Sequence, residues 1–224
     1  MTFFSAAGAA VGGGPTTSPS WIAVGTADTT GTVSATPAYG TNLSGDLFVM
    51  IVAGRLTACT TPAGWTLQAG PNDTAGRRVY IFTRDARSTG SESGTVSVTL
   101  VANSQVSTIH TFRNVATSSF VEDVSVNGST SSGTGYFPPA VTSTQAHELA
   151  IFAGADGDQV GGAASITSTG GTWTVRDTQG TGVGNNAAYA LYTCDLTAAG
   201  TITGGDGGLS VNQHTSVGFA LVGV

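Results

Sequence analysis

The chain has 224 residues, a formal net charge of −6, no lysine, and only 9% charged residues. This length allows one large β domain or two small ones with a sizeable core. Clustered cations are needed to bind nucleic acid or an anionic membrane surface, and their absence argues against both partners. The 40% of apolar residues recur in strand-like runs, which favours a folded protein over a disordered one.

Residues 1–20 are rich in Gly, Ala, Ser and Pro and lack a positively charged beginning. We therefore expect no cleaved secretion signal here, and no run of the chain approaches the roughly 18 apolar residues of a membrane helix. The segment is predicted to be a flexible N-terminal arm. Phe3 and Phe4 near its tip are candidate anchors for docking into a groove of a partner, the alternative being a frayed terminus.

From Trp21 onward the chain repeats itself. Residues 21–116 and 117–224 contain the same series of strands, turns and short motifs, at offsets of about 102 to 110 residues. The matched motifs are Pro37-Ala38 with Pro139-Ala140, Asp46 with Glu148, and Thr83/Asp85 with Thr193/Asp195. The order of these elements indicates an internal duplication.

The expected strands follow in chain order, without helical periodicity. The continuous apolar run at 47–52 is typical of a central strand covered on both faces, and 149–152 repeats it. The segment 96–100 alternates apolar and hydroxyl residues, which predicts one solvated face, and 217–221 alternates in the same way. With about six strands per unit, the sequence predicts an antiparallel, jelly-roll-like β-sandwich. Because no linker separates the units, we expect one compact body.

Two tryptophans occupy matching places in the repeat. Trp65 follows the turn Pro62-Ala63-Gly64, and Trp173 follows Gly170-Gly171. A large ring kept in both units is better explained by packing than by ligand binding. We therefore predict that each ring fills the core of its own half.

Residues that could carry chemistry are few. His110, His147 and His214 fall in different elements, and His110 is expected to be a hydrogen-bonded core or edge residue. Asp156 and Asp158 lack the further oxygen donors of a calcium loop. We predict no enzyme activity, no metal and no cofactor, although Glu122, Asp123 and Glu148 could meet as a carboxylate pair for glycoside hydrolysis. Cys59 and Cys194 are predicted to be free thiols.

The segments Gly45-Asp46-Leu47 and Pro62-Ala63-Gly64-Trp65, with the strands that follow them and the second copy, resemble a β-sandwich family of tailed-bacteriophage structural proteins. The second copy departs from these motifs. The resemblance covers most of 21–224 and implies a non-enzymatic virion protein, either a capsid-decorating or a minor tail component. It also implies assembly in the host bacterial cytoplasm, with other virion proteins as partners. We expect a symmetric homo-oligomer, with a trimer as the working assumption.

The alternative function is a carbohydrate-binding module that recognises the host surface. β-Sandwiches often bind sugars through exposed aromatic side chains, and the candidates are Trp21, Tyr39, Tyr136 and the loop around Asp156. Coplanar rings that face the solvent would favour this alternative. Buried rings would remove its main support.

Overall fold

The structure, a computed structural model, describes residues 14–31, 33–55, 58–74, 77–100, 105–129, 133–134, 139–156, 168–181, 187–204, 210–211 and 214–224. The candidate residues Phe3, Phe4 and Tyr136 lie outside these ranges. The regular elements in the described ranges are all β-strands, which confirms the predicted all-β class. In the same ranges we find no helix long and apolar enough to span a membrane.

The described strands divide between the two halves of the chain. Those of the first half are β1 (Ser20–Val24), β2 (Ser34–Ala35), β3 (Leu47–Arg55), β4 (Trp65–Thr74), β5 (Arg77–Arg84), β6 (Val98–Thr99) and β7 (Gln105–Arg113). Those of the second half are β8 (Val121–Ser129), β9 (Gly133–Thr134), β10 (Val141–Ser143), β11 (Glu148–Asp156), β12 (Ser168–Thr169), β13 (Thr174–Gly180), β14 (Ala188–Leu196), β15 (Gly200–Gly204), β16 (Ser210–Val211) and β17 (His214–Val222).

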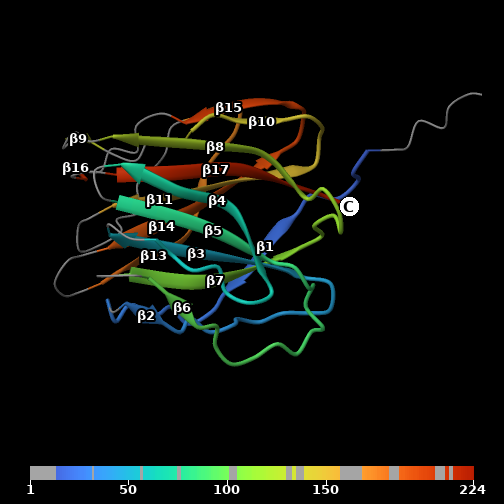
Figure 1. Cartoon of the computed structure of the whole chain (residues 1–224). Helices are drawn as coiled ribbons and strands as arrows, with labels where there is room; N and C mark the ends of the chain where they lie inside the picture. The colour runs from blue at the N-terminus through green and yellow to red at the C-terminus, as the bar shows by residue number, and fades with distance from the viewer. Residues whose placement is uncertain are drawn as a thin grey trace, which may run out of the picture.

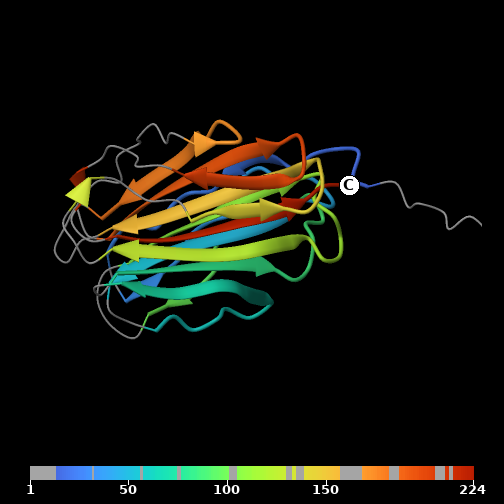
Figure 2. The same cartoon turned by 90° about the horizontal axis from the view of Figure 1, so that it is seen from above.

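Two antiparallel five-stranded sheets form the body of the protein. Their strand orders are β1-β7-β3-β5-β4 and β13-β14-β11-β17-β8. The long strands of both sheets run along one axis (Figures 1 and 2). One apolar cluster contains residues from both sheets and lies between them, so the two sheets pack face to face as a β-sandwich. We call this cluster the central core.

The middle strand of each sheet is covered on both faces, as the continuous apolar runs predicted. In β3, Leu47, Val49 and Ile51 belong to the central core, whereas Phe48 and Met50 belong to a second cluster on the outer face. β11 divides in the same way between the central core and a third cluster. This division follows from the alternation of side chains along a strand.

The outer faces of the sheets are covered by small additional layers. The three-stranded sheet β10-β15-β12 lies outside one sheet, and the pair β2-β6 lies outside the other (Figure 1). The predicted solvated face is confirmed at 96–100, where Ser97 and Thr99 are exposed. It is wrong for β17, which is buried throughout, because Pro139 and Val141 of the outer layer lie against Gly218.

The two sheets share one strand order. Matching β1, β7, β3, β5 and β4 to β8, β17, β11, β14 and β13 gives the same sequence of neighbours in each sheet. Residue pairing agrees as well, because Val49 pairs with Thr83 and Ile151 pairs with Thr193. We call two residues corresponding when they occupy the same place in this match. Each five-stranded sheet therefore draws its described strands from one half of the chain.

The described part of the predicted arm begins at Gly14 and contacts the end of the chain. The backbone amides of Thr16 and Thr17 donate hydrogen bonds to the carbonyl of Val224 at 2.9 and 2.8 Å, and Pro19 is buried. The start of the described chain and the C-terminus thus lie at the same end of the sandwich (Figure 1).

Candidate functional site

A cavity of about 490 Å³ opens on the outer side of the first half. We call it the first-half cavity. Its lining combines two aromatic rings, an arginine, a carboxylate and two hydroxyl groups, which come from Tyr39, Trp65, Arg84, Asp85, Thr95 and Ser97. Ligand sites typically have this size and this mixture of apolar walls with a few polar groups.

One wall of the first-half cavity is the turn that precedes β4. The amide of Trp65 donates to the carbonyl of Pro62 at 3.1 Å, and Gly64 between them has φ of 77°. A type II turn requires a positive φ at its third residue, which glycine adopts without steric cost. The amide of Asp85 in turn donates to the carbonyl of Gly64 at 3.0 Å, which ties this wall to the end of β5.

Arg84 and Tyr39 form the second wall. The guanidinium carbon of Arg84 lies 5.4 Å from the centre of the Tyr39 ring and 5.5 Å from that of Phe48. The rings of Tyr39 and Trp65 are nearly parallel, with an interplanar angle of 20° and centres 6.5 Å apart. A guanidinium group is attracted to the face of an aromatic ring, so Arg84 helps to hold the Tyr39 ring in its orientation.

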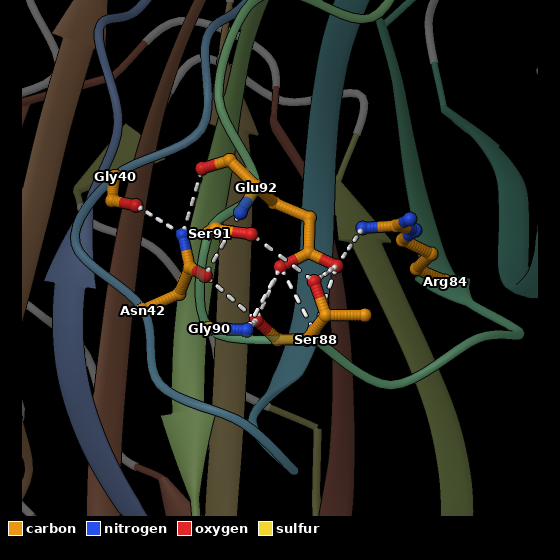
Figure 3. Close-up of polar contacts among 8 residues, drawn as sticks. Gly40, Asn42, Arg84, Ser88, Gly90, Ser91 and Glu92 are labelled. Atoms are coloured by element: carbon orange, nitrogen blue, oxygen red, sulfur yellow. Dashed lines mark hydrogen bonds and ion pairs between the residues drawn. The ribbon is translucent and has the colours of Figure 1, made fainter.

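Arg84 is held in place by Glu92, whose carboxylate lies 3.3 Å from its Nη1 atom (Figure 3). The same carboxylate accepts hydrogen bonds from the amides of Thr89 and Gly90 and from the hydroxyl of Ser88. These hydrogen bonds outweigh the effect of desolvation and lower the pKa of Glu92 to about 2. Glu92 is therefore a carboxylate at neutral pH.

The side chain of Asn42 connects the turn at residues 88–92 to the loop around Gly40 by hydrogen bonds. Its Nδ2 atom donates to the carbonyls of Gly40 and Glu92, both at 2.9 Å, and its Oδ1 atom lies 2.6 Å from the hydroxyl of Ser88 (Figure 3). The polar network around Glu92 thus fixes the position of Arg84, which contacts Tyr39.

A second cavity, of about 230 Å³, lies at the corresponding place of the other half. It is lined by Gly170 and the segment 196–202 and contains no aromatic or charged side chain. Arg84 corresponds to Cys194. Tyr39 corresponds to Val141, because each follows a matched Pro-Ala pair in the sequence. Both halves therefore have a hollow at this place, but its lining differs in chemistry.

Both tryptophans are buried in the core of their own half, as predicted. Trp65 is 6% exposed and Trp173 is 7% exposed. Each belongs to the cluster on the outer face of its sheet, which is built from residues of one half only, and not to the central core that both halves share. The reason is that these rings fill the space between each sheet and the small layer outside it.

Trp21, another residue proposed for sugar binding, does not line the first-half cavity. Trp21 is half-buried on β1, and the guanidinium carbon of Arg176 lies 5.5 Å from its ring centre. Asp156 ends β11, where it pairs with Ala188 and His214. Tyr39 is the sequence-predicted candidate that lines the cavity, and sequence reasoning missed Arg84 and Glu92.

His110 belongs to a buried polar cluster between the two sheets. This agrees with the prediction that it is a hydrogen-bonded core or edge residue. Its Nδ1 atom accepts from the indole of Trp21 at 3.4 Å, so its Nε2 atom carries the proton of the neutral ring. That Nε2 atom lies 3.1 Å from the hydroxyl of Thr108 and 3.3 Å from that of Tyr189. The hydroxyl of Tyr189 also contacts Thr108 and donates to Asp177.

This cluster favours a neutral histidine. Burial lowers the pKa of His110 to about 4, although Asp177, 3.8 Å away, acts in the opposite direction. The residues that correspond to Thr108, His110 and Tyr189 are Val217, Phe219 and Val79, all in the central core. The fold can therefore fill this place with apolar side chains.

Two of the three carboxyl groups considered for glycoside hydrolysis do meet. Glu148 is 0% exposed, and burial together with the neighbouring Glu122 raises its pKa to about 7. The carboxylate of Asp123, by contrast, accepts a hydrogen bond from the amide of Thr142. None of the three lines either cavity.

Within the described ranges, no three His, Cys, Asp or Glu side chains come together as a group that could hold a metal ion. Cys59 and Cys194 are both free, as predicted, and burial raises the pKa of Cys59 to about 12. Comparison with protein-family models, curated proteins and solved structures gave no match.

Proposed function

We propose that the protein is a non-enzymatic structural component of a tailed-bacteriophage virion. It is displayed on the particle as a capsid-decorating or minor tail protein and acts through contacts with other virion proteins and with copies of itself. The resemblance of its sequence motifs to such proteins is the starting point. Assembly in the host cytoplasm and a trimeric state belong to the same proposal.

The observation that carries this proposal is the position of exposed apolar side chains on the sheet edges. Val124 and Val126 on β8 are 44% and 56% exposed, and both Leu67 on β4 and Val175 on β13 are exposed as well. β4, β8 and β13 are edge strands of the two sheets. Edge strands offer unpaired backbone groups to a neighbouring chain, and apolar side chains there favour such a contact.

We also infer that the sandwich consists of two copies of one unit, as the sequence repeat predicts. The common strand order and the matching residue pairs of the two sheets support this inference. So does a shared contact, because Gln68 and Arg176 each donate to the corresponding threonine, Thr83 or Thr193, at 2.7 Å. The jelly-roll-like connection remains a prediction.

The proposal is tested by adding purified protein to particles of the encoding phage assembled without it. The wild-type chain should co-sediment with the particles, and the double variant Val124→Asp/Val126→Asp should not. Val33→Asp is the matched control, because Val33 is 46% exposed but lies outside the edge strands. Equal sedimentation of wild type and double variant would contradict a role for β8, and failure of wild type to bind would contradict the proposed function.

A further inference from the structure

The first-half cavity is lined by more polar and aromatic groups than the packing of the sheet requires. In the second half the positions of Tyr39 and Arg84 are taken by Val141 and Cys194, both buried, and neither lines the second cavity. In the first half, Tyr39 and Arg84 remain half-buried and line a cavity of about 490 Å³, compared with about 230 Å³ in the second half. We propose that the first-half cavity binds a neutral hexopyranose unit of a saccharide, independently of whether the chain belongs to a virion.

The half-buried ring of Tyr39 supplies the surface for the apolar face of the sugar ring, and Trp65, which is 6% exposed, packs beside it. The nearly parallel rings of Tyr39 and Trp65 line one cavity, and both are held in fixed orientations. Arg84 contacts the Tyr39 ring, and the turn Pro62–Trp65 fixes the backbone of Trp65. Rigid aromatic side chains lose little conformational entropy when a ligand binds.

The polar groups of the rim match the hydroxyl groups of a sugar. Asp85, Thr95 and Ser97 are exposed at the cavity and offer a carboxylate acceptor and two hydroxyls that donate or accept. The hydroxyl of Thr66 donates to the Asp85 carboxylate, which orients it. A few placed polar groups on an apolar wall are what give such sites specificity.

The charges at the cavity favour a neutral saccharide over an acidic one. The positive charge of Arg84 is compensated by Glu92 at 3.3 Å, and Asp85 adds a negative charge at the rim. The chain as a whole has a net charge of −6. An anionic sugar or a phosphate group would therefore meet net repulsion.

The backbone at the cavity favours a sugar over an extended peptide. Peptides that add a strand to a sheet need free backbone groups. Here the amides of Tyr39, Asp85 and Val96 already donate to the carbonyls of Gly94, Gly64 and Pro37 at 3.0 to 3.1 Å. These three amides are therefore not free to pair with a peptide strand, which leaves the side chains of the cavity as the groups that recognise the sugar.

The test follows the indole N–H signals of the ¹⁵N-labelled full chain, which has three tryptophans. Glucose, galactose, mannose and N-acetylglucosamine are added separately at about 50 mM, above a millimolar dissociation constant. At least one of them should shift the Trp65 signal in a saturable manner. The Trp173 signal should stay in place, because Trp173 packs in a cluster with Val141 and Cys194, which take the places of Tyr39 and Arg84.

Variants distinguish binding at this cavity from binding elsewhere. Tyr39→Val introduces the residue of the second half and should weaken binding at least about tenfold, with the thermal unfolding temperature as the folding check. Asp85→Asn, which keeps the shape of the rim, should also weaken binding. Thr197→Val in the second-half cavity is the matched control and should leave the affinity unchanged.

Three results would overturn the proposal. One is a Trp65 signal that none of the four sugars moves. Another is a shift of equal size and affinity in Tyr39→Val and Asp85→Asn. The third is a response confined to glucuronic acid or to a proline-containing peptide, which would assign the cavity to an acidic or a peptide ligand.

Discussion

Asp46 and Arg113 form a two-point ion pair where β3 begins. The Nε and Nη2 atoms of Arg113 lie 2.8 and 2.9 Å from the two carboxylate oxygens of Asp46, which is 1% exposed. In the second half, Glu148 takes the place of Asp46, and Val222 takes the place of Arg113. The second half thus contains a buried acid with a carboxyl group, Glu122, as its neighbour instead of a cation.

This difference predicts that Glu148 destabilises the fold at alkaline pH. Its pKa is raised from 4.5 to about 7 in the folded chain, so the folded state binds more protons than the unfolded state between these values. The contribution of Glu148 to stability is therefore full below pH 4.5 and is lost as the pH rises through 7. Glu148→Gln keeps the shape and stays neutral, so it should raise the unfolding temperature at pH 8 relative to wild type.

The measurement is thermal unfolding of wild type and Glu148→Gln at pH 5 and pH 8. The stability difference between the two proteins should be larger at pH 8. Asp195→Asn serves as a control, because Asp195 is an exposed acid on the neighbouring strand β14. If the stability difference between wild type and Glu148→Gln were the same at pH 5 and pH 8, ionisation of Glu148 would not destabilise the fold, and the prediction would be contradicted.

His110 predicts the opposite pH dependence. Its folded-state pKa is about 4 and its ordinary value is 6.5, so the unfolded state binds more protons between these values. Its contribution is full above pH 6.5 and is lost as the pH falls toward 4, by at most about 3 kcal/mol. Part of this loss is offset by Glu148, which gains stability over the same range.

The variant His110→Phe tests this prediction with the residue that the other half uses, Phe219. In chemical denaturation from pH 7 to pH 4, the variant should lose less stability than wild type. Its absolute stability at pH 7 is a separate quantity, because the indole of Trp21 loses its acceptor. An identical pH profile for the two proteins would remove His110 as the source of acid sensitivity.

The two tryptophans should be of similar structural importance. Trp65→Ala and Trp173→Ala each remove a large buried ring from an outer-face cluster and should each cost roughly 3–5 kcal/mol in the free energy of unfolding. Guanidinium denaturation of both variants at pH 7 measures this cost. Trp21→Ala, at a half-buried position, should cost less. A loss below about 1 kcal/mol at either buried site would contradict its packing role.

The sequence predicted the strands whose pattern is long and regular. The runs at 47–52 and 149–152 identified the middle strands of both sheets because a strand covered on both faces has no polar position. The repeat also placed the two tryptophans at matching points of the chain. Their burial and their place in the core of each half were both predicted correctly.

What the sequence did not predict is the layer outside the second sheet. β10 and β12 have three and two residues, too few for a periodic pattern, whereas β6 lies in the segment 96–100, whose alternation was recognised. Because β10 was missed, the second face of β17 was expected to be solvated. The cavity was also missed, since Tyr39, Trp65 and Arg84 come together only when the loop before β3 folds over the outer face. Comparing the two halves of the sequence could have indicated it, because Arg84 stands where the second half has Cys194.

The central claim, a structural role in a virion, is tested most directly by quantitative mass spectrometry of particles purified from the phage that encodes the chain. The account predicts that the protein remains with the particles through density-gradient centrifugation. It also predicts a fixed copy number relative to the major capsid protein or the tail. Its recovery only in the soluble fraction of the lysate, with none on the particles, would contradict the account.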